Sequence, residues 1–143
     1  MQPPPVDITV KPDVTLTPEE LGAHVLPTGS WRLPSGGQIS ALAGYDAGDW
    51  WVQDAAAALP ARLLSPAKGT RVLDLCAAPG GKTLQLAAMG AEVTALDISG
   101  PRLARLAQNL ARAGLQAETV VADALHWQPN SPFPMILLDA PCS

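Results

Sequence analysis

The stretch VLDLCAAPGGKT, residues 72–83, decides the fold. Its first five residues have the length and composition of a short buried strand, and a glycine pair followed by a helix-like run, residues 82–89, comes directly after them. Three more strand-like segments lie downstream at residues 92–96, 117–121 and 135–138. Strands that alternate with helices form parallel sheets through right-handed crossovers. The sequence therefore predicts a doubly wound α/β fold with about four parallel strands in this region.

A second helix is predicted between the second and third of these strands. Ser99 is a suitable N-cap with a proline in the following turn, and Gly114 is a suitable stop. Between them, apolar residues repeat at the spacing of one helix face: Leu103, Leu106, Ala107 and Leu110. We expect this face to pack on the sheet.

The residues before this region have a different pattern, and we expect three parts in the chain. Residues 1–16 are predicted to be a proline-rich linker, residues 17–66 a small leading α+β subdomain, and residues 67–143 the doubly wound part. In the leading part, Thr17-Pro18-Glu19-Glu20 has the capping-box pattern of a short helix. Residues 31–45 suggest strands or a hairpin. Asp54 is a candidate cap for an alanine-rich helix that Pro60 should break or kink.

Composition limits the possible classes of protein. With 143 residues, 48% of them hydrophobic, one domain is expected. The chain has two distant cysteines and no leader, which favours a cytoplasmic protein, and no run approaches the ~18 apolar residues of a membrane span. The net charge of −4 argues against a general nucleic-acid clamp. We interpret Arg102, Arg105 and Arg112 as one solvated helix face, and we expect no metal site.

Candidate ligand-binding residues fall where parallel strands end, which is where doubly wound sheets bind their ligands. Asp97, Asp123 and Asp139 each lie at or just after the end of a strand. The loop after the first strand supplies the rest: Cys76, Ala77, Ala78, Pro79, Gly80, Gly81 and Lys82. Its glycines allow the backbone to turn sharply and approach a ligand. Asp74, inside the strand, is interpreted as structural or supporting.

The aspartates have different expected partners. Asp97 has two acceptor oxygens suited to the hydroxyls of a ribose, which implies an adenosine-type ligand. Asp123 can accept from an exocyclic amino group, and Asp139 can meet a cationic or amino-bearing centre. Together these features suit S-adenosylmethionine as the cofactor.

Two motifs resemble the signatures of RNA cytosine-5 methyltransferases of the RsmB/Sun/Fmu type. They are LDLCAAPGGKT at residues 73–83 and LDAPCS at residues 138–143. Residues 51–54, which read WVQD, also resemble the segment before the cofactor domain of that family. The resemblance therefore runs from about Trp31 to the last residue.

The resemblance implies a Rossmann-like class I methyltransferase fold, incomplete after its fourth strand. It implies that the loop of residues 76–82 wraps the methionine part of S-adenosylmethionine, that Asp97 holds the ribose, that Asp123 meets the adenine edge, and that Asp139 lies between the cofactor and the target base. The implied substrate is cytosine in RNA, with 16S ribosomal RNA as the expected partner.

The reaction of that family begins with a thiolate that adds to carbon 6 of cytosine, after which carbon 5 accepts the methyl group. The resemblance places the attacking cysteine in a motif beyond residue 143 and gives Cys142 a part in product release. We therefore expect the isolated chain to be inactive. Its last strand, residues 135–138, is expected to be an open apolar edge that favours self-association.

Other functions fit the sequence less well. A phosphate-binding NTPase would need a glycine where Cys76 stands, and the loop also lacks the G-x-G-x-x-G pattern of nicotinamide-dependent oxidoreductases. The alternative that stays open is a non-catalytic module that binds a cofactor or assists assembly.

Overall fold

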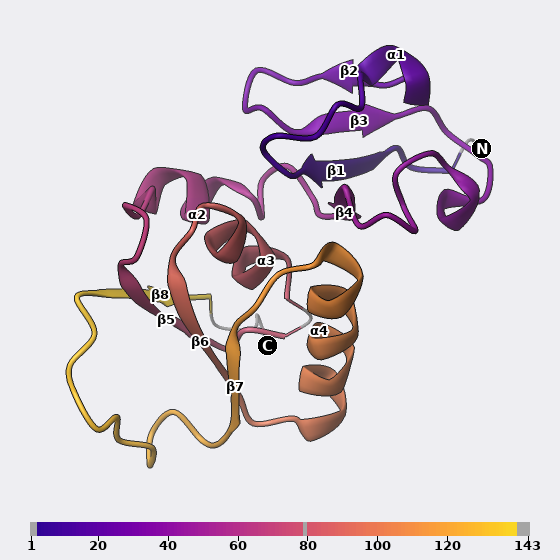
Figure 1. Cartoon of the computed structure of the whole chain (residues 1–143). Coiled ribbons are helices and arrows are strands. Elements are labelled where there is room, and N and C mark those ends of the chain that lie inside the picture. Colours follow the sequence, from indigo (N-terminus) through magenta and orange to yellow (C-terminus); the bar gives the residue numbers. More distant parts are fainter. Residues whose placement is uncertain (1–2, 79, 140–143) are drawn as a thin grey trace.

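The computed structural model describes residues 3–78 and 80–139. In these residues the chain forms two four-stranded sheets, one in the leading part and one in the part that follows (Figure 1). None of the helices in the described ranges is both long and apolar enough to cross a membrane.

The leading sheet is antiparallel and has the strand order β2-β3-β1-β4. Its strands are β1 (Val6–Val10), β2 (His24–Val25), β3 (Trp31–Leu33) and β4 (Trp50–Val52), with helix α1 (Pro18–Leu21) and a 3-10 turn, η1 (Ile39–Ala41). Ile8, Leu21, Leu33 and Trp50 form its core. The range 1–16, expected to be a linker, thus contributes strand β1, because Ile8 fills the centre of this core.

The second sheet has four parallel strands in the order β7-β6-β5-β8, as the alternating pattern predicted (Figure 1). The strands are β5 (Arg71–Leu75), β6 (Glu92–Asp97), β7 (Glu118–Val121) and β8 (Met135–Leu138). Helices α2 (Leu59–Leu64), α3 (Gly81–Ala88) and α4 (Gly100–Ala113) pack against it. The order of the strands switches between β5 and β8, and a switch point is where such sheets bind ligands.

The predicted start of α1 and both predicted ends of α4 are confirmed. The Ser99 hydroxyl accepts a hydrogen bond from the backbone N–H of Arg102 at 3.3 Å, and Gly114 closes α4 with φ at +65°. At α1, the backbone N–H of Thr17 donates to the Glu20 carboxylate at 2.6 Å. Capping depends on neighbouring residues alone, which is why the sequence predicts it well.

One local prediction in the leading part is wrong, and another is confirmed in part. No side chain caps α2, and residues 55–58 form a turn in place of a helix. Helix α2 begins at Leu59, so Pro60 lies in its first turn, where a missing N–H costs no internal hydrogen bond. For residues 31–45, the prediction of a strand is confirmed by β3, whereas a hairpin within this range is not formed, because β3 pairs with β1 and β2.

The C-terminal end of α4 joins the two sheets. The Lys11 ammonium donates to the Ala113 carbonyl at 2.7 Å. The Arg112 guanidinium donates to the carbonyls of Tyr45 and Trp50 at 2.7 and 3.1 Å and lies 4.1 Å from the centre of the Tyr45 ring. The expectation of a solvated arginine face is therefore wrong for Arg112, because its partners come from the leading sheet.

Candidate functional site

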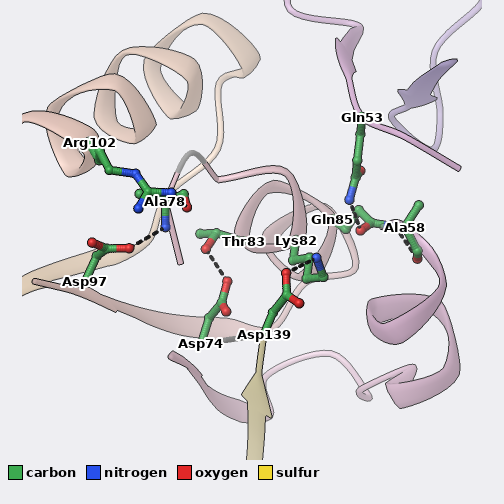
Figure 2. A network of polar contacts seen from close by, with 10 residues as sticks. All are labelled: Gln53, Ala58, Asp74, Ala78, Lys82, Thr83, Gln85, Asp97, Arg102 and Asp139. Carbon is green, nitrogen blue, oxygen red and sulfur yellow. Dashed lines mark hydrogen bonds and ion pairs between the residues drawn. The ribbon is translucent and has the colours of Figure 1, made fainter. Parts of the chain in front are cut away.

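The loop after β5 begins with an unusual backbone conformation. Cys76 has φ at +59°, a value that residues with a Cβ rarely adopt. Two contacts then hold the loop against the next strand, since the Ala77 N–H donates to the Leu96 carbonyl at 3.0 Å and the Ala78 N–H donates to the Asp97 carboxylate at 3.1 Å. The Arg102 guanidinium donates to the Ala78 carbonyl at 2.8 Å from the other side (Figure 2). The loop is thus fixed by β6 and α4 together.

Gly80 ends this loop at a position where only glycine fits. Its φ is +114°, and a Cβ there would lie 3.2 Å from Leu106 Cγ and would overlap Leu106 Cδ1. Because Leu106 is fully buried in the core under α4, it has little room to move. The glycine therefore lets the start of α3 lie directly on α4.

Asp74 is a buried carboxyl group with an incomplete set of partners. It is 1% exposed, and its Oδ2 accepts a hydrogen bond from the Thr83 hydroxyl at 2.6 Å. Its Oδ1 is buried and has no partner among the described residues. Burial raises the pKa of Asp74 to about 6, while Thr83 and Lys82 act in the opposite direction. A buried acceptor without a donor is the kind of group that a polar ligand completes.

Lys82 and Asp139 form an ion pair beside Asp74. The Lys82 ammonium donates to the Asp139 carboxylate at 2.5 Å (Figure 2), and the Lys82 side chain is 13% exposed whereas that of Asp139 is 55% exposed. The pair joins the first turn of α3 to the end of β8. It therefore bridges the switch point, because α3 follows β5 and Asp139 follows β8.

These groups line one cavity of about 340 Å³, a size typical of small-molecule sites. The second sheet and its loop contribute Asp74, Cys76, Ala77, Ala78, Gly80, Gly81, Lys82 and Asp139. The leading part contributes Val52, Gln53, Asp54 and Ala57. The structure thus brings Asp139 together with every described residue of the predicted loop. The wall from the leading part and Asp74 were not predicted, although the WVQD pattern marked part of that wall.

Asp97 and Asp123 are not among the residues that line this cavity. Asp97 is 3% exposed, and its two carboxylate oxygens accept from the backbone N–H groups of Ala78 and Ser99 at 3.1 and 2.9 Å. Each of these oxygens keeps a second lone pair. The pKa of Asp123 lies below its usual range, because it accepts from the Leu125 N–H and lies near His126. Pro79 and Cys142 lie outside the described residues.

The Cys76 thiol is the other reactive group at the cavity. Burial and the nearby carboxylates of Asp97, Asp74 and Asp139 raise the pKa of this thiol. Cys76 therefore stays protonated at neutral pH and is a poor nucleophile. In the part of the chain that the structure describes, no cluster of His, Cys, Asp or Glu side chains could hold a metal ion.

The donor set fits a ligand that carries both positive and negative charge. Asp74 Oδ1 offers a buried acceptor for an ammonium group. The Lys82 ammonium, which already donates one hydrogen bond to Asp139, has further N–H donors for a carboxylate. The methionine part of S-adenosylmethionine has these two charges, so the residues present fit this cofactor.

Fold and site together define a doubly wound α/β protein of the methyltransferase type. A methyltransferase homologue from Pyrococcus horikoshii has a similar solved structure, with a TM-score of 0.82 and 27% identity, covering 99% of this chain and 52% of that one. Residues 61–143 match the model of the 16S rRNA methyltransferase RsmB/F family. The chain belongs to this family.

Two curated relatives carry the name ribosomal RNA small subunit methyltransferase B. The protein from Sodalis glossinidius is 44% identical over 126 residues, which is 85% of this chain and 29% of the relative. The protein from Pseudomonas syringae pv. tomato is 48% identical over 111 residues, which is 73% of this chain and 25% of the relative. The chain thus spans little more than a quarter of the length of these relatives.

Proposed function

We propose that this chain forms the cofactor-binding half of an S-adenosylmethionine-dependent enzyme that methylates carbon 5 of cytosine in RNA, with 16S ribosomal RNA as the substrate. The observation that carries the proposal is the cavity at the switch point, where the loop of residues 76–82 meets Asp139. Membership of the RsmB/F family supports the choice of RNA. We also propose that the cofactor-binding half starts at residue 67, after a leading α+β part, and that the protein acts in the cytoplasm.

Within this proposal each residue has one task. The loop residues Cys76, Ala77, Ala78, Pro79, Gly80, Gly81 and Lys82 hold the methionine part of the cofactor. Asp97 accepts from the ribose hydroxyls with its remaining lone pairs, and Asp123 accepts from the adenine amino group. Asp139 orients the target base next to the cofactor. S-adenosylmethionine supplies an electrophilic methyl group when bound.

The proposal separates binding from turnover. Methylation at carbon 5 needs a thiolate that adds to carbon 6. Within the described residues the cysteine is Cys76, and its raised pKa makes its thiol unsuited to adding to carbon 6 of cytosine. Cys142, to which we assign a part in product release, lies outside the described residues. We therefore expect the 143-residue chain to bind the cofactor and to show no appreciable methyl transfer by itself.

Two measurements test the proposal. Calorimetry with S-adenosylmethionine, ATP and NAD should give binding for the first ligand alone. Transfer of tritium from labelled S-adenosylmethionine to undermethylated ribosomal RNA should be absent for the short chain and present for a chain extended through its natural C-terminal continuation. Robust transfer by the short chain that disappears in Cys142→Ala would show that the nucleophile is assigned wrongly.

A non-catalytic module that binds a cofactor or assists assembly is the second candidate. Among the described residues β8 is an edge strand, and its Ile136 and Leu138 are 55% and 63% exposed, which favours this candidate. An apolar edge of this kind can pair with another chain, so self-association is part of this candidate. Sedimentation of the chain across a range of concentrations, followed by the same transfer assay on the extended chain, distinguishes the two candidates.

A further inference from the structure

A chain of buried hydrogen bonds crosses from the leading sheet to α3. The Thr9 hydroxyl and the Trp51 indole N–H both donate to Gln53 Oε1, at 2.8 and 3.1 Å. Gln53 Nε2 donates to Gln85 Oε1 at 2.6 Å, and Gln85 Nε2 donates to the Ala58 carbonyl at 3.0 Å (Figure 2). Gln53 is 6% exposed and Gln85 is 3% exposed, so water contributes little to this network.

The donors and acceptors of this network can be arranged in one way only. An amide oxygen accepts and an amide nitrogen donates, so the two donors on Gln53 Oε1 force the nitrogen of Gln53 toward α3. Gln85 must then present its own oxygen to Gln53 and its nitrogen to Ala58. A buried network in which each of these groups has a partner holds its members in one arrangement. The Gln53 side chain is therefore fixed relative to α3.

Gln53 also touches the turn that forms the cavity. It lines the cavity together with its neighbours Val52 and Asp54, and Lys82 lines the same cavity. Its side chain lies so close to Gly81 that a Cβ at that position would be 3.0 Å from Gln53 Cδ and 3.1 Å from Nε2. The network thus sets how far the leading wall stands from the first turn of α3.

We propose that Gln53 is a positioning residue for the cofactor site, which holds the leading segment as one wall of the cavity against the turn at Gly81. Cofactor affinity then depends on a residue before the region 61–143 that matches the family model. This inference rests on the proposed function, since it assumes that the cavity binds the cofactor. The wall acts by keeping the loop in its binding geometry, and Gln53 takes no part in chemistry.

The chain offers a matched control for this proposal. Lys11 also joins the leading part to a helix of the second part, through its bond to the Ala113 carbonyl at the C-terminal end of α4, and Lys11 does not line the cavity. Gln53→Met and Lys11→Met each remove a hydrogen bond between the leading part and a helix of the second part, and each leaves an unbranched side chain of similar length. If Gln53 only stabilises the fold, both variants should have a lower Tm and should change cofactor affinity alike. If Gln53 positions the wall of the cavity, cofactor affinity should fall in Gln53→Met alone.

The experiment measures the Kd for S-adenosylhomocysteine by calorimetry, and the Tm, on the full 143-residue chain and the two variants. We expect both variants to have a lower Tm. Gln53→Met should raise Kd about tenfold, the effect of losing one or two net hydrogen bonds, and Lys11→Met should leave Kd unchanged. Should Gln53→Met fail to fold, Thr9→Val removes one donor to Gln53 with little change of shape and should raise Kd in the same direction.

The outcomes separate this inference from the proposed function. If the unaltered chain does not bind S-adenosylhomocysteine, the proposed function fails, and the inference fails with it. If the unaltered chain binds and Gln53→Met binds equally well, the inference alone is overturned. An equal loss of affinity in Gln53→Met and Lys11→Met also overturns it, as does an unchanged Kd in a folded Thr9→Val.

Discussion

Replacement of Gly80 by alanine tests how the loop and α4 fit together. The new Cβ would have to accept φ at +114°, a conformation that costs a residue with a side chain about 1–3 kcal/mol. It would also overlap Leu106 Cδ1 and lie 3.2 Å from Leu106 Cγ. Forcing an extra methyl group into a packed core costs roughly another 1–3 kcal/mol. We therefore expect a loss of about 2–6 kcal/mol in the free energy of unfolding.

Thermal unfolding measures this loss, because about 2–4 °C of Tm corresponds to 1 kcal/mol in a chain of this size. Gly36→Ala is the matched control, since Gly36 has φ at +87° and a Cβ there would meet nothing within 4 Å. It should show the backbone cost alone. In a Leu106→Ala background, Gly80→Ala should cost less, because the overlapping atoms are gone. Equal losses for Gly80→Ala and Gly36→Ala, or strict additivity in the double variant, would refute the packing argument.

Three further predictions concern the carboxylates and the loop. The pKa of Asp74 in the folded chain is raised to about 6. The contribution of the protonated Asp74 to the free energy of unfolding is therefore fully present below about pH 4 and is lost as the pH rises through 6. Asp74→Asn should abolish this loss of about 3 kcal/mol, as thermal unfolding at pH 4 and pH 7 can measure. Asp97→Ala should weaken the binding of S-adenosylhomocysteine in calorimetry by removing charge-assisted hydrogen bonds of roughly 1.5–3 kcal/mol each, and unchanged affinity would exclude the ribose assignment. Gly81→Val should weaken it more than Lys82→Ala, because a branched side chain has no room beside Gln53, and the reverse order would favour a phosphate-type site.

The sequence predicts the second sheet well because its signals are local. Each helix end is marked by residues within one turn of it, such as Ser99 before α4 and Gly114 after it. The strands are short apolar runs between these ends, and their alternation with helices leaves one class of fold. The position of β8 next to β5 depends on a contact between residues about 60 positions apart, such as Leu73 and Ile136, which no local pattern specifies.

The leading sheet was harder to predict because its pairing is not local. Strand β1 pairs with β3 and with β4, which lie about 20 and 40 residues further along the chain, and short elements and turns separate them. The many prolines near the N-terminus suggest a linker, but Ile8 of β1 is buried in the core, and Val6 and Val10 of the same strand pack against it. Tertiary packing, and not the local residue preferences, therefore determines that residues 6–10 form a strand.

In the candidate site too, residues marked by the neighbouring sequence could be predicted, and contacts between residues far apart in the sequence could not. The loop of residues 76–82 and Asp139 were predictable, because a ligand loop follows the first strand and an acidic residue ends another. Asp74 was interpreted as structural or supporting, since the sequence does not reveal that its Oδ1 has no donor among the described residues. Gln53 and Gln85 are 32 positions apart and carry no charge, so their contact could be found in the structure alone.

The leading sheet has a core of its own, but the two parts also share one buried cluster across the change of topology near residue 67. Trp51 of β4 is 2% exposed and belongs to the same buried cluster as Leu84 of α3 and Leu106 of α4. The last carbonyl groups of a helix need donors from outside it, and Lys11 supplies one to Ala113 from the leading sheet. The C-terminal end of α4 therefore contacts the leading part, and the start of α3 contacts it at Gly81. Since both helices also hold the loop of the cavity, the leading part and the second sheet form the site as one structural unit.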